Sequence, residues 1–300
     1  MTPPSQSLAG AGYGVAAFGL WGLFPLYFKA VSSVPAPEVL AHRILWSVAW
    51  VAALLWLLRQ WPEVRRALKD RSTAGRLLLS AVLIAVNWLV FIWAVANERV
   101  LEASLGYFIT PLVSVLLGRL VLGERLARLQ VVAVVLAAAG VGYMLVDLGK
   151  LPWVSLALAA TFGSYGLARK TTAVAAAPGL FVETLLLAPV AAGFLLWLGA
   201  DGTFGRTGID MDLLLVAAGL VTAAPLILFA QAARRLRLGS LGLFQYLTPT
   251  CQMLLAVFAF GEAFTRGHAV TFGCIWLGLA LYSWSTLQSR GSRAPPLRDA

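Results

Sequence analysis

Residues 104–111 read SLGYFITP, and residues 240–249 read SLGLFQYLTP. Eleven mostly apolar residues follow each Thr-Pro pair before a Gly-Glu pair, which stands at 123–124 and again at 261–262. From Thr-Pro to Gly-Glu the two copies are offset by 138 residues (123 to 261), and the second copy has two extra residues before its Thr-Pro. The chain of 300 residues therefore contains an internal repeat of nearly half its length.

The composition is that of a chain that lies largely in lipid. Charged residues make up 12% of the sequence and hydrophobic residues 60%, whereas about a quarter of the residues of a typical soluble protein are charged. Such a chain cannot cover itself with a water-compatible surface. The net charge of +10 is scattered between apolar runs rather than gathered in one domain, so we expect no nucleic acid as a partner.

The sequence carries no signature of a cofactor, a metal site or an ATP-driven pump. It contains no H-E-x-x-H, G-x-S-x-G or Walker pattern. Cys251 and Cys274 lie inside apolar runs, which favours packing roles over a disulfide or a zinc site. Residues 1–7 contain no Lys or Arg ahead of the first apolar run, so we interpret that run as a retained membrane helix and not as a cleavable signal peptide.

Ten apolar runs are long enough to cross a bilayer as helices, because about 20 apolar residues span the hydrocarbon core. With the N-terminus in the cytoplasm, most Lys and Arg residues fall in cytoplasmic loops and ends, as the positive-inside rule requires. The sequence therefore predicts an all-α integral membrane protein with both termini cytoplasmic. The predicted spans are 8–29, 38–58, 76–96, 101–122, 128–147, 151–170, 178–198, 212–233, 239–260 and 267–288.

Five spans in each copy of the repeat place the second copy in the opposite orientation. We expect a first five-helix repeat at 8–147, a second at 151–288 and a cytoplasmic tail at 289–300. Inverted repeats of this kind are a recurrent architecture of secondary transporters, whose substrate site lies between the halves near the middle of the membrane.

Three segments of the first repeat resemble the RarD proteins, a branch of the drug/metabolite transporter superfamily that has paired EamA-type repeats. They are residues 41–47 (AHRILWS), 87–95 (NWLVFIWAV) and 101–109 (LEASLGYFI). The resemblance covers about residues 8–288 and implies a ten-helix permease of the bacterial inner membrane. Thr110 departs from the pattern, since we expect Asn before the proline there.

The resulting hypothesis is a secondary active transporter that moves a small organic metabolite or drug-like solute across the inner membrane by alternating access. Its expected partners are a small-molecule substrate and membrane lipid, and both a monomer and a homodimer stay open. The alternative is an integral-membrane enzyme, or an accessory subunit, that acts on lipid-linked substrates. The two histidines, His42 and His268, have no matching acid cluster, which counts against an enzyme.

His42 and Arg43 are the strongest candidates for substrate binding. An ionisable group inside a span is costly and usually faces a cavity or a partner. A cationic side chain in the second span would meet an anionic part of the substrate, such as a carboxylate. As alternatives, Arg43 reaches the outer membrane interface or pairs with Glu38, about one turn earlier.

Asn87 and Trp88 lie at the middle of the third predicted span. An Asn at that depth needs hydrogen-bond partners, which either a neighbouring helix or a substrate in a central cavity could supply. An aromatic ring beside an amide suits a small polar molecule that has an apolar part. We therefore place both residues at the substrate site.

Tyr107 and Gln245 occupy matching positions of the repeat at the offset of 138, and Tyr246 follows. Positions related by the repeat face the same space if either does, so we predict that these three residues line the pathway and that Tyr107 faces Gln245. Gln231 and Gln252 either add polar capacity there or only tie helices together.

Glu183 is the one acid well inside a span of the second repeat. It could exchange protons if burial raised its pKa, which would make it a candidate for coupling transport to protons. The alternative is an ion pair with Arg169 or Lys170 across the short cytoplasmic loop.

The pairs Thr110-Pro111 and Thr248-Pro249 recur at equivalent positions. A proline inside a helix removes a backbone hydrogen bond and kinks the helix. We therefore predict one hinge in each repeat, with a static kink as the alternative. The Gly-Glu pairs at 123–124 and 261–262 read as helix ends, with Arg125 and Arg266 close enough to pair with the glutamates.

Overall fold

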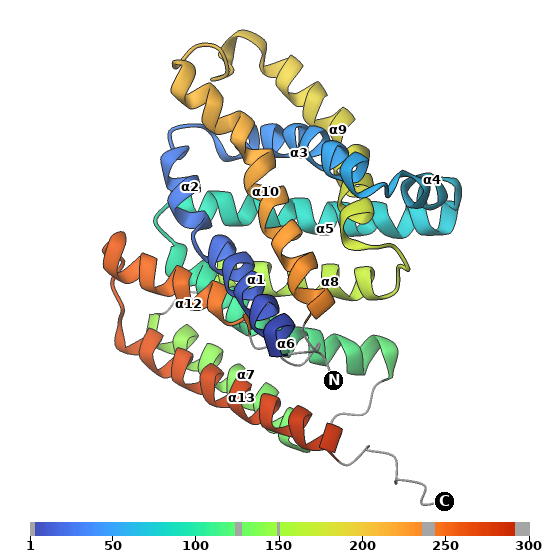
Figure 1. Cartoon of the computed structure of the whole chain (residues 1–300). Helices are drawn as coiled ribbons and strands as arrows, with labels where there is room; N and C mark the ends of the chain where they lie inside the picture. The colour runs from blue at the N-terminus through green and yellow to red at the C-terminus, as the bar shows by residue number, and fades with distance from the viewer. Residues whose placement is uncertain (1–3, 124–127, 149–150, 236–243, 292–300) are drawn as a thin grey trace, which may run out of the picture.

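The computed structural model describes residues 4–123, 128–148, 151–235 and 244–291, and within these ranges every regular element is helical (Figure 1). Each apolar run of the sequence is mostly helical where it is described. The helices are α1 (Pro4–Gly22), α2 (Phe24–Ala30), α3 (Ala36–Leu58), α4 (Trp61–Lys69), α5 (Arg71–Ala96), α6 (Val100–Leu122), α7 (Arg128–Leu148), α8 (Trp153–Lys170), α9 (Ala176–Leu198), η1 (Gly199–Asp201), α10 (Ile209–Arg235), α12 (Leu247–Leu254), the π-helix η2 (Leu255–Ala259) and α13 (Arg266–Gly291).

Seven helical segments among the described residues are long and apolar enough to cross a membrane. The chain is therefore an all-α, multi-pass membrane protein. A shorter apolar helix covers Leu247–Ala259, and α8 and α13 lie where two further spans are predicted. The seven segments are Leu8–Ala30, Ala36–Leu58, Arg71–Ala96, Val100–Val121, Arg128–Asp147, Ala176–Asp201 and Ile209–Phe229.

The first predicted span consists of two helices, since α1 ends at Gly22 and α2 begins at Phe24. Pro25 stands in the first turn of α2, where a missing N–H costs no helical hydrogen bond. The hydroxyl of Tyr27 donates to the carbonyl of Leu214 in α10 at 2.8 Å. This bond holds α2 against the second half of the chain.

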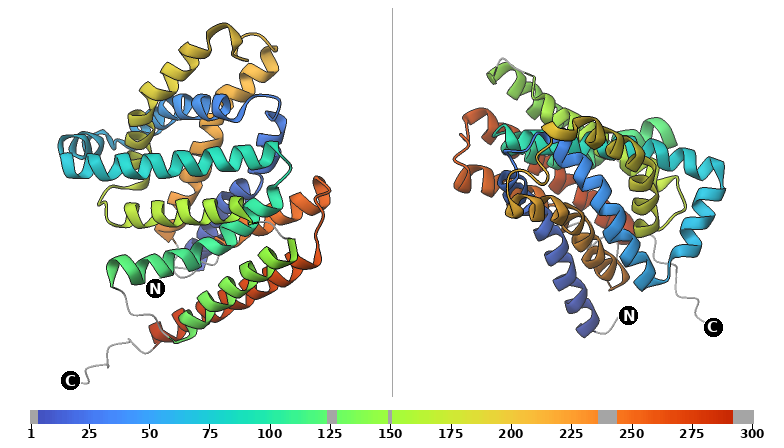
Figure 2. Two further views of the ribbon diagram at one scale, coloured as in Figure 1. Left: turned by 180° about the vertical axis from the view of Figure 1, so that it is seen from behind. Right: turned by 90° about the horizontal axis from the view of Figure 1, so that it is seen from above.

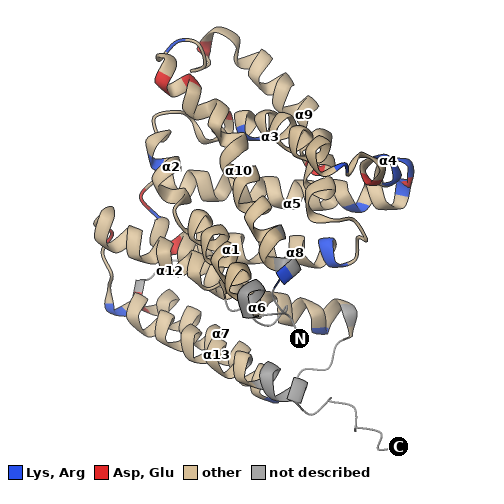
Figure 3. Ribbon diagram, in the orientation of Figure 1, with Lys and Arg blue, Asp and Glu red and all other residues tan. Residues whose placement is uncertain are grey.

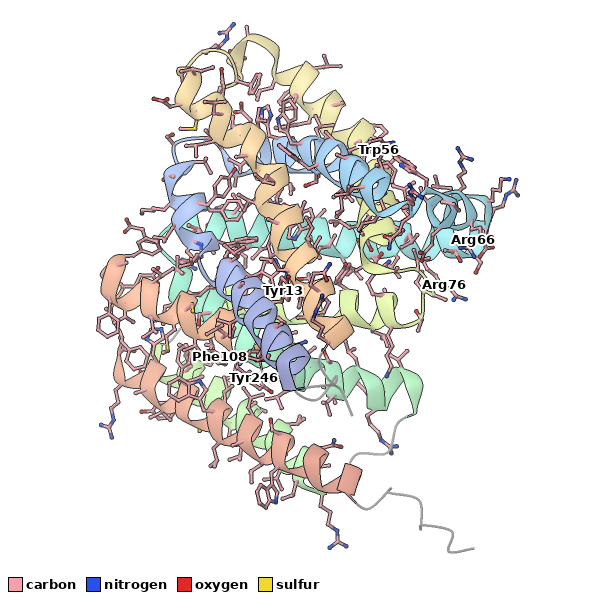
Figure 4. The ribbon with its side chains drawn as sticks, in the orientation of Figure 1. Tyr13, Trp56, Arg66, Arg76, Phe108 and Tyr246 are labelled. Carbon is pink, nitrogen blue, oxygen red and sulfur yellow. The ribbon has the colours of Figure 1, made fainter. Side chains whose placement is uncertain are left out.

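The segment between the second and third predicted spans contains a helix that the sequence analysis missed. Helix α4 is amphipathic, with Val64 and Ala67 buried and its basic residues at the exposed end of the molecule (Figure 3). The Glu63 carboxylate accepts the N–H of Ala175 at 2.6 Å, just before α9. Arg66 and Arg76 are exposed at this end (Figure 4), which makes α4 a short surface helix docked on the α8–α9 loop.

Helix α5 begins earlier than the predicted boundary of residue 76. The Asp70 carboxylate accepts the N–H groups of Ser72 and Thr73 at 3.2 and 3.1 Å. This N-cap satisfies donors that a helix start otherwise leaves without partners. The helix can therefore begin at Arg71, before its apolar part.

The helices pack in a pattern that maps onto itself when the two halves are exchanged. In chain order, α1–α2, α3, α5, α6 and α7 correspond to α8, α9, α10, α12 and α13. Under this exchange, the packed pair of α6 and α8 corresponds to the packed pair of α12 and α1. The pair of α1 and α10 corresponds to the pair of α8 and α5, and the pair of α3 and α10 corresponds to the pair of α9 and α5. The pairs α3 with α9, α6 with α12 and α7 with α13 correspond to themselves, and α7 and α13 run side by side along one edge in each view (Figures 1 and 2).

Close contacts at glycine follow the same exchange. A Cβ on Gly140 of α7 would lie 3.2 Å from the carbonyl oxygen of Thr271, and a Cβ on Gly278 of α13 would lie 2.9 Å from that of Ala133. Both members of this pair of contacts are related by the repeat offset of 138 residues (140 to 278 and 133 to 271). Small residues let membrane helices approach closely, so the two halves use the same contact to join α7 and α13.

A second pair of contacts links the first helix of each half to the fourth helix of the other. A Cβ on Gly22 would lie 2.5 Å from the Cβ of Cys251 in α12, and one on Gly163 would lie 2.9 Å from Cγ1 of Val113 in α6. Gly22 and Gly163 are offset by 141 residues, and Val113 and Cys251 by 138 (113 to 251). The repeat is thus visible in the packing of individual residues and not only in the order of the helices.

Candidate functional site

The candidate site centres on Arg43, which lies in the middle of the packed helices α2, α3, α5 and α10. Its side chain is buried, with the residue 4% exposed. Its Nε donates to the hydroxyl of Thr222 in α10 at 3.0 Å, and that hydroxyl donates in turn to the carbonyl of Ala218 at 2.9 Å. The orientation of the guanidinium is therefore fixed from the α10 side.

Aromatic rings surround the rest of the Arg43 guanidinium. Its Cζ lies 4.0 Å from the ring centroid of Trp88 in α5, 5.4 Å from that of Phe28 and 5.7 Å from that of Phe24. A cation over an aromatic face is attracted by the ring's quadrupole, most strongly over Trp. Tyr27 and Tyr107 also lie within electrostatic range of the guanidinium. We call Arg43, Trp88, Phe24, Phe28, Tyr27 and Tyr107 the aromatic cage.

The alternative in which Arg43 pairs with Glu38 does not agree with the geometry. The Arg43 side chain is buried among the helices. Glu38 does not pair with it; its carboxylate instead accepts the N–H and the hydroxyl of Thr203, at 2.6 and 2.9 Å, in the loop before α10. None of the salt bridges between described residues includes Arg43.

His42 points to a different neighbour from Arg43. Its ring stacks on Phe204 of the α9–α10 loop with centroids 5.0 Å apart, and its Nε2 is buried without a hydrogen-bond partner among the described residues. Adjacent residues of a helix face directions about 100° apart, so only one of the two can enter the aromatic cage. His42 lies beside the cage, under the loop.

Asn87 joins three helices. Its Nδ2 donates to the carbonyl of Leu158 at 3.1 Å and to the hydroxyl of Thr161 at 2.9 Å, both in α8, and its Oδ1 accepts the hydroxyl of Tyr107 in α6 at 3.1 Å. The neighbouring-helix alternative is therefore the one that the contacts favour. Trp88, the adjacent residue, places its ring against Arg43. Asn87 thus orients Tyr107 of the aromatic cage.

The predicted pair Tyr107 and Gln245 do not face each other within the described contacts. The ring of Tyr107 lies against Phe91 and Phe162, with centroids 5.7 and 5.8 Å apart. Gln245 is exposed in the turn before α12, while Tyr246 is partly buried against the main core. The reason is that α12 begins only at Leu247, after this turn, whereas α6 is continuous through Tyr107.

Of the two other glutamines, Gln252 ties two helices together, whereas Gln231 bonds within its own helix. Gln252 is buried, and its Nε2 donates to the carbonyl of Trp21 in α1 at 3.3 Å. The Oε1 of Gln231 accepts a hydrogen bond from Arg235, one turn later in α10, at 2.6 Å.

Glu183 in α9 has its partners within the protein. Its side chain is 0% exposed, its Oε1 accepts the hydroxyl of Ser80 in α5 at 2.6 Å, and the same oxygen lies 3.6 Å from Nη1 of Arg169. Tyr165 donates to Oε2 at 3.4 Å. The predicted ion pair with Arg169 is therefore present, and it ties α9 to α5 and α8.

The two Thr-Pro pairs differ in their positions. Pro111 lies inside α6, and the hydroxyl of Thr110 donates to the carbonyl of Gly106 at 3.0 Å. Pro249 lies in the first turn of α12, which begins at Leu247, so the prediction of a proline in mid-helix is wrong there within the described part of the chain. Thr248 donates to the carbonyl of Phe18 in α1 at 2.8 Å instead of to its own helix.

Glu262 has a different role from the one predicted. Its two oxygens accept the N–H groups of Val100 and Leu101 at 2.6 and 2.8 Å, and so cap the start of α6. Its expected ion pair with Arg266 is not among the salt bridges of the described residues. Burial raises the pKa of the Glu262 carboxyl above its usual range, although the two N–H groups act in the opposite direction. The other Gly-Glu pair, with Arg125, lies outside the described residues from Glu124 onward.

Sequence reasoning missed four residues around Arg43: Phe24, Tyr27, Phe28 and Thr222. Tyr27 and Thr222 each carry a hydroxyl within an otherwise apolar run, which was a usable signal. Their relation to Arg43 depends on the packing of α2 and α10 on α3, which the sequence did not reveal.

Comparisons with known proteins define the class of the molecule. A model of the EamA-like transporter family matches residues 8–146. A crystal structure with 21% sequence identity superposes with a TM-score of 0.59 over 98% of this chain and 100% of that chain, which supports the fold. The class is thus a membrane transporter, not an enzyme.

Curated relatives specify the branch. The chain is 49% identical to Protein RarD of Salmonella typhi, over 92% of this chain and 95% of the relative. It is 46% identical to Protein RarD of Escherichia coli (strain K12), over 92% and 94%, and 45% identical to the uncharacterized transporter YojE of Bacillus subtilis, over 95% and 96%. The chain belongs to the RarD-type permeases of the drug/metabolite transporter superfamily.

Proposed function

We propose that this permease is a secondary transporter that moves a small organic solute across the bacterial inner membrane by alternating access. In this proposal ten helices cross the membrane as two inverted repeats, 8–147 and 151–288, and both termini are cytoplasmic. The observation that carries it is the exchange of helix pairs between the halves, including the glycine contacts at the repeat offset. Two inverted halves around one site can open alternately to the two sides of the membrane.

The two buried charged clusters suit such an exchange. Arg43 joins α3 to α10, and Glu183 joins α9 to α5. The pair of α3 and α10 becomes the pair of α9 and α5 when the two halves are exchanged. With inverted repeats, the Arg43 cluster lies toward the outer side and the Glu183 cluster toward the cytoplasm. We propose that they close the outer and the inner ends of the pathway.

Movement needs places where the helices can bend. We propose one hinge at Thr110-Pro111 inside α6 and its counterpart at the turn that leads into Thr248-Pro249. Glu183 is the candidate coupling group, because protonation would remove its ion pair with Arg169 and loosen α9 from α8. Substrate would bind in the aromatic cage, toward the outer end of the pathway.

Transport by the protein alone tests the proposal. The purified chain would be reconstituted into proteoliposomes, and counterflow of labelled organic acids, amines and neutral drug-like solutes would be measured. We expect saturable counterflow of at least one solute, faster than in protein-free vesicles. Folded protein that moves no solute in the panel would contradict a single-component transporter.

The topology is tested separately. Single cysteines at residue 2 and residue 298 would be labelled in intact cells and in inside-out vesicles with an impermeant maleimide, in a variant without Cys251 and Cys274. We expect labelling of both positions only in inside-out vesicles. Labelling of one terminus from each side would contradict an even number of spans.

A further inference from the structure

We infer that the substrate is a small organic monocarboxylate with an aromatic or other planar apolar group, and that its carboxylate binds the guanidinium of Arg43. This inference rests on the proposed function and specifies its substrate class. Four observations carry it: the burial of Arg43, the absence of a neutralising acid among its described neighbours, the free edge of the guanidinium, and the aromatic rings around it.

The first argument concerns charge. Arg43 is 4% exposed and forms no ion pair with a described residue. Two acids at this end of α3 and α10 are committed elsewhere, since Glu38 binds Thr203 and Asp212 accepts the N–H of Gly205 at 2.8 Å. A buried charge is strongly unfavourable unless it is paired. A bound anion would supply the missing charge.

The second argument concerns geometry. The hydroxyl of Thr222 accepts the hydrogen bond from Nε of Arg43, and the ring of Trp88 covers a face of the guanidinium. Among the described residues, no hydrogen bond is formed by either Nη atom. The two Nη groups present parallel N–H bonds at a spacing that matches the two oxygens of a carboxylate. The side chain is therefore oriented before the ligand arrives, which lowers the cost of binding.

The third argument concerns the aromatic rings of the cage, which disfavour neutral polar solutes and phosphate esters as ligands. The hydroxyl of Tyr27 already donates to the carbonyl of Leu214, and the hydroxyl of Tyr107 already donates to Asn87. Neither hydroxyl is therefore left to donate to a neutral polar solute. The remaining surface of the cage consists mainly of the aromatic rings of Trp88, Phe24 and Phe28. One cation matches a single negative charge better than the two charges of a phosphate ester. A planar apolar group would stack against the rings.

The test uses matched compounds that differ only in charge: benzoate, 3-phenylpropionate and indole-3-propionate, the amide of each, and 3-phenylpropan-1-amine. Binding to the purified wild-type protein would be followed by the rise in melting temperature and by quenching of tryptophan fluorescence. We expect at least one carboxylate to bind about tenfold or more tightly than its amide, since a charge-assisted hydrogen bond is worth at least that factor. The amine should bind no better than the amide.

Variants assign the effect to Arg43. Arg43→Gln should weaken carboxylate binding about tenfold or more, and Arg43→Lys should fall between it and the wild type because it keeps the charge and loses the paired donors. The matched control is Arg99→Gln, which removes an outer arginine that is paired with Glu102 and should leave binding unchanged. Trp88→Phe provides a second variant that keeps an aromatic ring beside Arg43 and should weaken binding less than Arg43→Gln.

The outcomes separate this inference from the proposed function. If no carboxylate binds, if the amides bind equally well, or if Arg43→Gln binds the carboxylate as the wild type does, the inference is overturned. Transport of a neutral or cationic solute by Arg43→Gln at the wild-type rate would also overturn it while leaving the proposed transporter function intact.

Discussion

Arg43 and Glu183 each lie seven residues after the first residue of their helix, Ala36 of α3 and Ala176 of α9, yet their surroundings differ. Glu183 has a hydroxyl, a phenol and an arginine beside its carboxylate. Arg43 has one hydroxyl and a set of aromatic rings. The charge in the second half is neutralised within the protein, whereas the charge in the first half is not. The comparison leads us to propose that Glu183 stabilises the fold in addition to any coupling role, and that Arg43 binds a ligand.

The largest expected effect on stability comes from Glu183→Ala. It leaves Arg169, whose side chain is 14% exposed, without its carboxylate, and breaking a buried pair costs about 3 kcal/mol or more. The free energy of unfolding would be measured by titration with a denaturing detergent in mixed micelles. Glu98→Ala is the control, because its pair with Lys29 is largely exposed and should be worth less than about 1 kcal/mol. A loss no larger than that of the control would refute a stabilising role for Glu183.

Ser80→Ala should have the next largest effect. It removes the 2.6 Å hydrogen bond to Glu183 and leaves a buried carboxylate with one partner fewer, at a cost of about 2 kcal/mol. The same detergent titration measures it. If the double variant Ser80→Ala, Glu183→Ala lost the sum of the two single effects, the two residues would not be coupled and the cluster would not act as a unit.

Thr222→Val should cost less stability, about 1 kcal/mol. It removes the acceptor of Arg43 Nε while the aromatic rings stay in place. Its main effect should be on the orientation of Arg43. The loss in the free energy of carboxylate binding should therefore be larger than the loss in the free energy of unfolding. The melting temperature with and without 3-phenylpropionate checks this, and a variant that binds the carboxylate as the wild type does would show that Thr222 is not needed to fix the guanidinium.

The smallest expected effect concerns Glu262, a partly buried carboxylate that backbone N–H groups satisfy in place of a cation. Because its pKa is raised in the folded protein, its contribution to stability is present below the unfolded pKa, about 4.3, and is lost as the pH rises through the folded pKa. The stability of the wild type relative to Glu262→Gln should therefore fall from acid to neutral pH.

Asp70 gives a control of opposite sign for that titration. Its pKa is lowered, chiefly by the hydroxyl and N–H of Thr73, so its contribution is present above the unfolded pKa and is lost as the pH falls through the folded pKa. The stability of the wild type relative to Asp70→Asn should rise from acid to neutral pH. Melting temperatures between about pH 4 and pH 7 measure both, and slopes of the same sign would contradict the assignment.

Much of the fold could be predicted from the sequence, because the length of each apolar run and the recurrence of the repeated motif are read directly from the residues. The positions of the helices follow from the apolar runs, and the repeat offset recurs in the contacts of Gly140 and Gly278. Local capping was harder to predict. The N-cap at Asp70 moved the start of α5, and the break at Leu23 divided the first run into two helices.

The site was predicted in part, for a related reason. Arg43, Trp88 and Tyr107 were found because polar or aromatic residues inside an apolar run carry information by themselves. The partners of each residue depend on which helices pack together, and so the bonds of Asn87 to α8 and of Glu38 to Thr203 were not foreseen. The two-residue insertion before Thr248 also broke the exact equivalence on which the pairing of Tyr107 with Gln245 was based.

The central claim is that Arg43 serves the ligand and not the fold, and Arg43→Met tests it most directly. A buried charge without a paired acid is unfavourable for folding, so an apolar side chain of similar length should not lower the stability. We would measure the free energy of unfolding of this variant together with its counterflow of 3-phenylpropionate in proteoliposomes. The account predicts a protein at least as stable as the wild type that no longer transports the carboxylate. A variant that is strongly destabilised, or one that transports the carboxylate normally, would contradict it.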